Sequence, residues 1–256
     1  MNPVVTSTYD PVFIALSFAM AVIGSFIALT AARRLRRSDG ALSYANTISA
    51  GVALGGIGVW SMHFVGMLAL KMDVASSYSM TETIISLLAA IVASSIARAF
   101  VAHAPDRLAR IVGAGTLLGL SVAVMHYLGM FGLRINGYVQ WDYGVIALSI
   151  AIAIVAATAA LWLAFNTSAL AVRSAAAVVM GVAVCAMHYT GMEAANFVCT
   201  TSNRMAFPRG TGYISSISLP GLVIAAAFTM ALLLALYQYF QQLEGMRQAV
   251  PGTVRR

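Results

Sequence analysis

The sequence predicts an all-α integral membrane protein of seven transmembrane helices, arranged as three parallel two-helix repeats and a seventh helix. Its N-terminus is expected outside the cell and its C-terminus in the cytoplasm. Of the 256 residues, 61% are hydrophobic and 9% are charged, whereas a soluble domain has about 25% charged residues. The apolar residues form runs of about 20, the length of a membrane-spanning helix. A hexapeptide also recurs three times at nearly constant spacing.

The apolar runs define the expected helices. They lack the alternation of polar and apolar residues found in barrel strands. No basic residue precedes the first run, so we expect it to be a helix of the protein and not a cleaved signal peptide. The seven expected helices are 12–32, 45–70, 83–103, 111–133, 145–165, 174–196 and 217–238.

The positive charge lies mostly on one side of the membrane if successive connections alternate between sides. Eleven arginines fall in 33–44, in 98–110, at Arg173 and after 240 on one side. The other side has only Lys71, Arg134, Arg204 and Arg209. Cytoplasmic connections have the excess of Lys and Arg, which gives the orientation stated above. The net charge of +7 therefore indicates orientation and contact with anionic lipid, and no nucleic-acid partner is expected.

The repeated hexapeptides are MHFVGM at 62–67, MHYLGM at 125–130 and MHYTGM at 187–192. They start 63 and 62 residues apart, and such a period indicates repeated architecture. Each period contains two helices, so all three copies cross the membrane in the same direction and lie at the same depth. Parallel repeats commonly surround an axis along the membrane normal, which could bring the three histidines together. The expected segments are repeats 8–71, 80–134 and 140–197, helix 217–238 and a cytoplasmic tail 241–256.

Within each hexapeptide, the histidine and the second methionine are four residues apart and share a helix face. The pairs are His63 with Met67, His126 with Met130, and His188 with Met192. Imidazole and thioether form a soft, neutral ligand set that suits copper, particularly Cu(I). The glycine three residues after each histidine would let a neighbouring helix or ligand approach closely. The alternative for each copy is a hydrogen-bonded packing histidine beside a core methionine.

Acidic residues open the first helix of each repeat. They are Asp10, Glu82 and Asp142. We expect them to cap the helix N-termini and to compensate the helix dipoles.

The three hexapeptides and their flanks resemble the MHYT domain, a bacterial integral membrane sensor domain. The similar segments are GIGVWSMHFVGMLAL at 56–70, AVMHYLGM at 123–130 and CAMHYTGM at 185–192. The similarity begins at STYDP, residues 7–11, and we assign residues 8–240 to one such seven-helix membrane domain.

The resemblance implies a bacterial inner-membrane module that binds copper near its outer face. It would sense a diatomic gas (O2, CO or NO) or redox state. The residues that match the family's ligands are Met62, His63, Met67, Met125, His126, Met130, Met187, His188 and Met192, with Tyr127 and Tyr189 as auxiliary residues. Phe64 replaces the tyrosine in the first copy, so a threefold role for the tyrosine is not expected.

Family members often continue into cytoplasmic output domains such as diguanylate cyclases, cyclic di-GMP phosphodiesterases or histidine kinases. Residues 241–256 are too few for such a domain. The module would therefore act on a cytoplasmic protein in trans, or form the membrane part of a longer protein, with a homo-oligomer left open.

Two other functions remain open from the sequence. Parallel repeats and intramembrane polar residues also occur in transporters, so the chain could carry copper or another small solute. Two of the three histidines could instead ligate a b-type haem. The sequence has no acid–base pair, nucleophile or phosphate-binding loop, so we expect no enzymatic activity from this chain.

Overall fold

The computed structural model describes residues 4–32, 42–102, 107–166 and 169–249. The arginines at 33–37, residues 103–106 of the second basic segment and the end of the tail lie outside the described residues. Seven helices are long and apolar enough to cross a membrane. The prediction of a seven-helix membrane protein is therefore confirmed.

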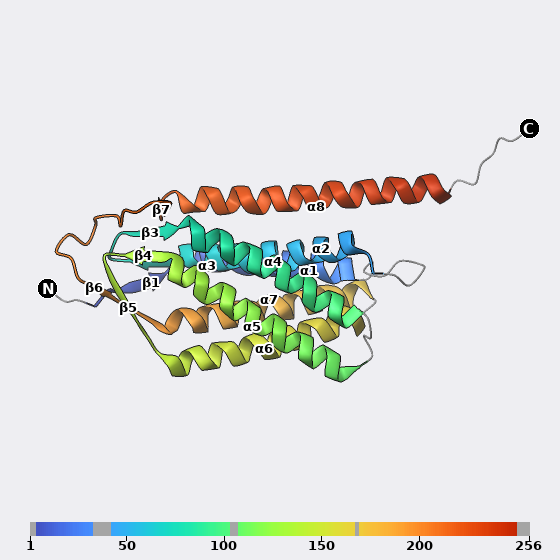
Figure 1. The fold of residues 1–256 in the computed structure, drawn as a ribbon, viewed down its shortest axis with the longest axis horizontal. Coiled ribbons are helices and arrows are strands. Elements are labelled where there is room, and N and C mark those ends of the chain that lie inside the picture. Colours follow the sequence, from blue (N-terminus) through green and yellow to red (C-terminus); the bar gives the residue numbers. More distant parts are fainter. Residues whose placement is uncertain (1–3, 33–41, 103–106, 167–168, 250–256) are drawn as a thin grey trace, which may run out of the picture.

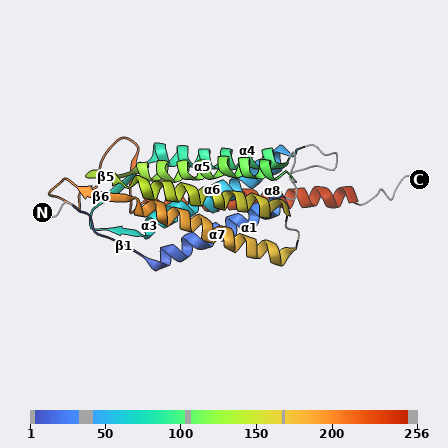
Figure 2. The ribbon, with the colours of Figure 1, turned by 90° about the horizontal axis from the view of Figure 1, so that it is seen from below.

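The helices run nearly parallel to one another along the long axis (Figures 1 and 2). Six of the spans are single helices: α1 Pro11–Ala32, α4 Met80–Ala102, α5 Leu108–Gly132, α6 Tyr143–Asn166, α7 Leu170–Glu193 and α8 Leu219–Ala249. The second span consists of α2 Tyr44–Gly51, the π-helix η1 Val52–Ser61 and α3 Met62–Ala69, and we refer to it as helix two.

Short strands lie together at one end of the bundle, which we call the strand end (Figure 1). They pair antiparallel as β1 with β2, β3 with β4, and β5 with β6, and β7 adds to β3. Each of the three pairs belongs to one repeat. It joins the segment before the first helix of that repeat to the segment after its second helix. Their bounds are β1 Ser7–Tyr9, β2 Leu70–Met72, β3 Ser76–Ser79, β4 Leu133–Ile135, β5 Gly137–Trp141, β6 Ala195–Cys199 and β7 Tyr213–Ser215.

These strands were not predicted. They have only three to five residues each, too few for a period-two pattern to be recognised beside long apolar runs. Their pairing satisfies backbone N–H and C=O groups where the chain leaves the helices. It also fixes the ends of the helices that contain the hexapeptides.

The first six spans form a closed ring. In it, the second helix of each repeat, which contains the hexapeptide, packs between the first helix of its own repeat and the first helix of the next repeat. Helix two contacts α1 and α4, α5 contacts α4 and α6, and α7 contacts α6 and α1. The last contact closes the ring, because it joins the third repeat to the first. The repeats therefore surround a common axis.

Helix two is the most enclosed span, with 94% of its apolar window buried, against 22–39% for the other six. Its glycines allow three neighbours to approach closely, since a Cβ at Gly58 would meet α1, at Gly55 α4 and at Gly56 α8. The glycines coincide with the π-helical stretch, and π-helical turns are rare and frequently occur at functional sites. The asymmetry arises because α8 covers helix two and has no counterpart on α5 or α7.

Helix α8 begins at Leu219 and continues to Ala249, beyond the predicted end at 238. The segment QQLEGMRQA that follows residue 240 consists mostly of good helix formers. The helix therefore extends past the ends of the other helices, away from the strand end (Figure 1).

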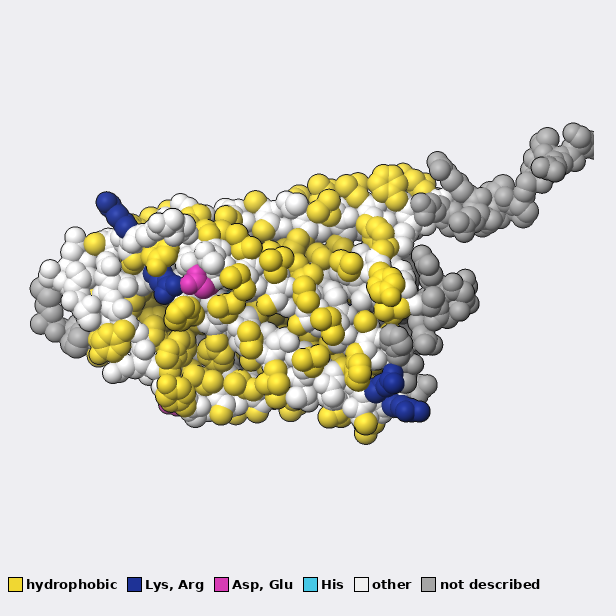
Figure 3. All heavy atoms as spheres, in the orientation of Figure 1, with side chains coloured by type: hydrophobic (Ala, Val, Ile, Leu, Met, Phe, Trp, Pro, Cys, Tyr) yellow, Lys and Arg dark blue, Asp and Glu magenta, His cyan; other side chains and the backbone are white. Residues whose placement is uncertain are grey.

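The sides of the bundle are largely apolar, and Lys and Arg side chains appear at its ends (Figure 3). Exposed apolar side chains include Leu88, Val155 and Phe228. A soluble monomer rarely exposes an apolar surface of this extent. The chain is a multi-pass membrane protein whose apolar sides face lipid.

Candidate metal centre

The three hexapeptide histidines meet on the axis of the bundle near the strand end. His63 lies on α3, His126 on α5 and His188 on α7, and all three side chains are fully buried. Their Nδ1 atoms form a nearly equilateral triangle, with separations of 3.1, 3.1 and 3.2 Å. The rings are roughly perpendicular to one another, at 78–88°. The equal depth expected from the repeat is therefore accompanied by direct contact.

The triangle has the dimensions of a three-imidazole metal site. The centre of a triangle of nitrogens 3.1–3.2 Å apart lies about 1.8 Å from each, slightly less than the 2.0–2.1 Å of zinc–imidazole bonds. A small outward movement of the rings would reach that distance. Among the described residues, this is the one cluster of His, Cys, Asp or Glu whose ligand atoms could hold a metal ion.

Hydrogen bonding between the histidines cannot satisfy the triangle. Each Nδ1 presents either a hydrogen or one lone pair. Among three such atoms at least two must be alike, so at least one of the three contacts opposes two donors or two acceptors. The three Nε2 atoms are also buried without a hydrogen-bond partner, and such groups are costly. A cation that accepts all three Nδ1 lone pairs would remove the conflict among the Nδ1 atoms and leave the hydrogens on Nε2, so the three imidazoles fit a metal ion.

The hexapeptide glycines make this convergence possible. The imidazole of His63 lies against Gly129, that of His126 against Gly191, and that of His188 against Gly66. A Cβ at any of these glycines would overlap the Nε2 atom of the facing ring. Each glycine thus accommodates the histidine of another repeat. The outer ring nitrogen of a metal-binding histidine usually donates to a carbonyl or carboxylate oxygen, whereas here it lies against a glycine.

The six hexapeptide methionines are all buried, with at most 2% of each residue exposed: Met62, Met67, Met125, Met130, Met187 and Met192. Met67 and Met130 line pockets of about 310 and 240 Å³ that also contain strand residues. Met187 lines a cavity on the other side of the histidines. Coordination by their sulfur atoms stays a prediction.

The two auxiliary tyrosines direct their hydroxyl groups away from the triangle. Tyr127 Oη lies 2.6 Å from Ser149 Oγ, and Tyr189 Oη lies 2.9 Å from Ser17 Oγ. Both serines are on the first helix of the adjacent unit in the ring. Each tyrosine ring packs edge-on against the preceding histidine, at a centroid distance of 4.8 Å. The tyrosines therefore position the histidines, and their hydroxyl groups bind serines.

In the first hexapeptide the bond between a tyrosine hydroxyl group and a serine is replaced by one from an indole N–H. Phe64 packs on His63 at the same 4.8 Å centroid distance. The equivalent serine, Ser86 on α4, instead faces Trp60, whose Nε1–H lies 3.1 Å from Ser86 Oγ and 3.1 Å from Thr83 O. The spacing in the sequence could have identified these serines. Each lies seven residues after the residue that directly precedes the first helix of its repeat.

Phe64→Tyr is expected to destabilise the protein by about 1–3 kcal/mol, since the new hydroxyl group is buried while Trp60 already uses Ser86. In a Trp60→Phe background the same substitution should cost clearly less, because the hydroxyl group can then bond Ser86 as in the other repeats. Thermal unfolding of the two single variants and the double variant measures this coupling. Additive effects would contradict the proposed equivalence of Trp60 and the tyrosines.

The prediction that three acidic residues cap the first helices is correct for two of them. Asp10 accepts from the backbone N–H of Val12, and Asp142 accepts from those of Gly144 and Val145. Glu82 does not occupy the cap position. It lies in the first turn of α4, where its charge compensates the helix dipole as predicted, and it forms an ion pair with Arg134 at 2.6 Å.

Ser79 precedes α4 in the place of Asp10 and Asp142, and it also hydrogen-bonds Glu82. Ser79 directly precedes α4, three residues before Glu82, at the position that Asp10 and Asp142 have before their helices. Glu82 was therefore mistaken for the cap because it is the acidic residue nearest the helix start.

Polar contacts tie the strand end together above the histidines. Tyr9 donates to Glu193 at 3.2 Å and packs edge-on against Tyr189. Burial, together with the Glu193 carboxylate, raises the pKa of the Tyr9 phenol, so this hydroxyl group remains a donor. Arg204 pairs with Asp73 at 2.8 Å, and this hydrogen bond lowers the pKa of the Asp73 carboxyl group.

Comparison with known proteins identifies a repeated family pattern. The family model MHYT, described as a bacterial signalling protein N-terminal repeat, matches residues 1–45, 56–114, 119–177 and 181–250. The last three matches start at 56, 119 and 181, six residues before the hexapeptides at 62, 125 and 187.

Several signalling proteins are similar to this chain. The bifunctional diguanylate cyclase/cyclic di-GMP phosphodiesterase MucR of Pseudomonas aeruginosa is 39% identical over 75% of the chain and 28% of its own length. The cyclic di-GMP phosphodiesterase NbdA of the same organism is 34% identical over 73% of the chain and 24% of its own length. The signalling protein YkoW of Bacillus subtilis is 30% identical over 74% of the chain and 24% of its own length. The chain thus matches about a quarter of the length of these relatives, and no solved structure matches it.

Proposed function

Because the chain belongs to the MHYT family of bacterial signalling proteins, we propose that it is a sensor module of the bacterial inner membrane. It binds copper between His63, His126 and His188, with hexapeptide methionines as further ligands. It detects a diatomic gas (O2, CO or NO) or redox state near the periplasmic face, where the strand end lies. The observation that supports this most directly is the triangle of buried Nδ1 atoms.

The donor set favours copper among the metals that imidazole binds. Three imidazoles alone suit zinc, copper, iron or nickel, whereas added thioethers favour Cu(I). The buried methionines of the same three helices are the nearest candidates for such ligands. When bound, copper supplies a redox-active ion that can also accept a diatomic ligand.

The residues of this chain have distinct tasks in the proposed site. The histidines bind the ion, the three glycines leave room for the rings, and the phenyl and phenol rings of Phe64, Tyr127 and Tyr189 hold their orientation. The buried, apolar surroundings exclude water. Because each ring lies against the backbone of a different helix, a change in metal–ligand distances would shift those helices relative to one another.

Helix two is the proposed route from the metal to the cytoplasm. It contains His63, and its π-helical stretch packs against α8 through Gly56 and Met230. Helix α8 continues beyond the bundle at the end opposite the strands. We propose that a shift of helix two moves α8, which passes the signal to an output domain or partner. Diguanylate cyclase and cyclic di-GMP phosphodiesterase are candidates, since these activities appear in the names of the relatives. This chain itself would not be catalytic.

The alternatives of transport and haem binding receive less support. A metal transporter requires further ligands along the path, and the described residues contain the one cluster near the strand end. A haem held by two histidines requires its porphyrin plane between them. Here the ring nitrogens lie 3.1–3.2 Å apart, which suits one small ion.

Metal analysis of the purified chain beside the His63→Ala/His126→Ala/His188→Ala variant tests the proposal. We expect copper in the unaltered chain, no Soret band, and loss of the metal in a variant that remains helical and monodisperse. Equal metal content in the two proteins would refute the shared site, and a Soret band with haem in place of copper would favour the haem alternative.

A further inference from the structure

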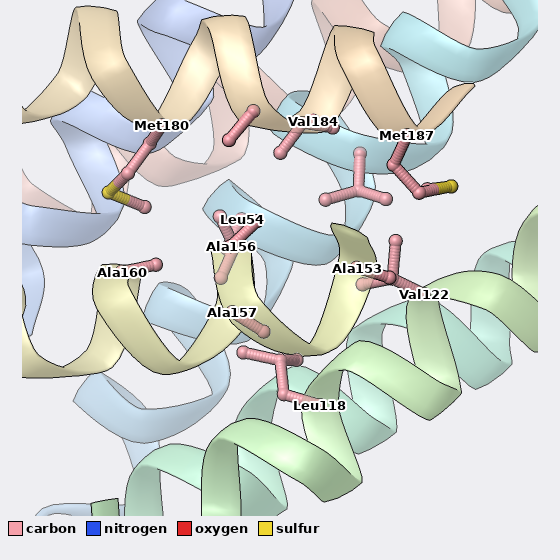
Figure 4. Close-up of a pocket in the computed structure, with 12 residues that line it drawn as sticks. Leu54, Leu118, Val122, Ala153, Ala156, Ala157, Ala160, Met180, Val184 and Met187 are labelled. Atoms are coloured by element: carbon pink, nitrogen blue, oxygen red, sulfur yellow. The ribbon is translucent and has the colours of Figure 1, made fainter. Parts of the chain in front are cut away.

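An apolar cavity of about 30 Å³ lies inside the bundle, next to the histidine cluster on the side away from the strands. Helix two, α5, α6 and α7 contribute its walls, and Figure 4 shows aliphatic and methionine side chains around it. One water needs roughly 10–15 Å³ of such space. The cavity can therefore hold one small molecule.

A layer of three valines separates the cavity from the histidines. Val59, Val122 and Val184 all line the cavity, and each precedes a hexapeptide histidine by four residues, about one helical turn. The pattern V-x-x-M-H thus occurs in all three repeats. Met187, directly before His188, also lines the cavity. The space therefore lies between helix two, α5, α6 and α7, about one helical turn from the histidines.

Small side chains on α6 leave this space open. Ala153, Ala156, Ala157 and Ala160 line it, at the spacing of a single helix face. Larger side chains at these positions would fill the cavity. Ala156 is only half-buried, so the wall on this side is one small residue away from the lipid.

We propose that this cavity binds a small apolar molecule, specifically a diatomic gas dissolved in the membrane. The walls contain no charged or hydrogen-bonding side chain, so water and ions find no polar partner there, whereas an apolar ligand such as xenon needs none. The inference rests on the proposed function in one respect: the cavity would bind the sensed gas next to the metal. The binding of an apolar atom does not depend on the metal.

Xenon NMR on the purified chain in detergent tests the cavity, with xenon itself as the probe. We expect a bound-xenon signal from the unaltered chain that disappears in Ala157→Leu. Ala159→Leu is the matched control, because Ala159 is exposed on the same helix and should leave the signal unchanged. Ala156→Leu is a second cavity-filling variant at a half-buried position, in case Ala157→Leu does not fold.

Absence of bound xenon in the unaltered chain, or a signal that persists in the folded cavity-filling variants, would overturn the proposal. Metal analysis of the same samples separates the two hypotheses. Metal without bound xenon removes the cavity proposal and leaves the sensor site, whereas xenon without metal supports the cavity and removes the sensor site.

Discussion

Alanine at any one of His63, His126 or His188 is expected to abolish tight copper binding, and not to remove one third of it. The three Nδ1 atoms converge on a single point, so the loss of one ligand affects one shared ion. The groups that hydrogen-bond metal-binding residues change the metal affinity by about 10–100-fold when they are lost. The loss of a ligand itself should therefore lower the copper affinity by at least about 100-fold. Competition titration of copper against a chelator of known affinity measures the effect, with one ion per chain in the unaltered protein.

The single variants also distinguish one shared site from three separate His–Met sites. Three separate sites would give about three ions per chain in the unaltered protein and two in each variant. Each alanine leaves a cavity among buried groups, so helical content and thermal unfolding should be measured on the same samples. A folded single variant that retains two thirds of the metal would contradict the shared centre.

Gly129→Ala is expected to weaken copper binding by about 10–100-fold or more, although glycine itself binds no metal. The added methyl group would overlap the ring of His63, which belongs to another repeat. The ring can relieve the overlap only by leaving the triangle or by separating α3 from α5. Gly66→Ala and Gly191→Ala should act in the same way on His188 and His126.

Gly113→Ala is the matched control for these substitutions, because Gly113 lies on the same helix as Gly129 with no atom near its added Cβ. Copper titration and thermal unfolding should be measured for both variants. Unchanged affinity in a folded Gly129→Ala protein would show that the contact between this glycine and the imidazole does not position the metal ligand.

Much of the fold followed from local patterns. The apolar runs predicted seven spans, and the described residues contain seven helical spans at corresponding positions. Hydrophobicity dominates in such segments because a backbone within lipid must satisfy its own hydrogen bonds, which a helix does. Local patterns failed for the short strands, whose pairing joins segments far apart in the chain. The extension of α8 does agree with a local pattern, the good helix formers after residue 240.

The site was predicted in part. The repeat identified the histidines and their common depth. The tyrosines are expected as auxiliary residues of the metal site, whereas their hydroxyl groups bind Ser149 and Ser17. The exchange of a tyrosine hydroxyl group for the Trp60 indole was also not foreseeable from spacing. Trp60 and Phe64 are one turn apart, and only the position of α4 shows that Ser86 meets the indole.

The common depth of the three histidines follows from the repeat alone, because two crossings per repeat return every hexapeptide to the same side in the same direction. The repeat does not show that these histidines touch through Nδ1, that each imidazole lies on the glycine of another repeat, or that α8 covers helix two. Helix periodicity reflects contacts over a few residues. The ring of six helices closes through contacts between helices that are far apart in the chain. In those contacts, side-chain volume and the lack of a Cβ at glycine determine how closely the backbones approach.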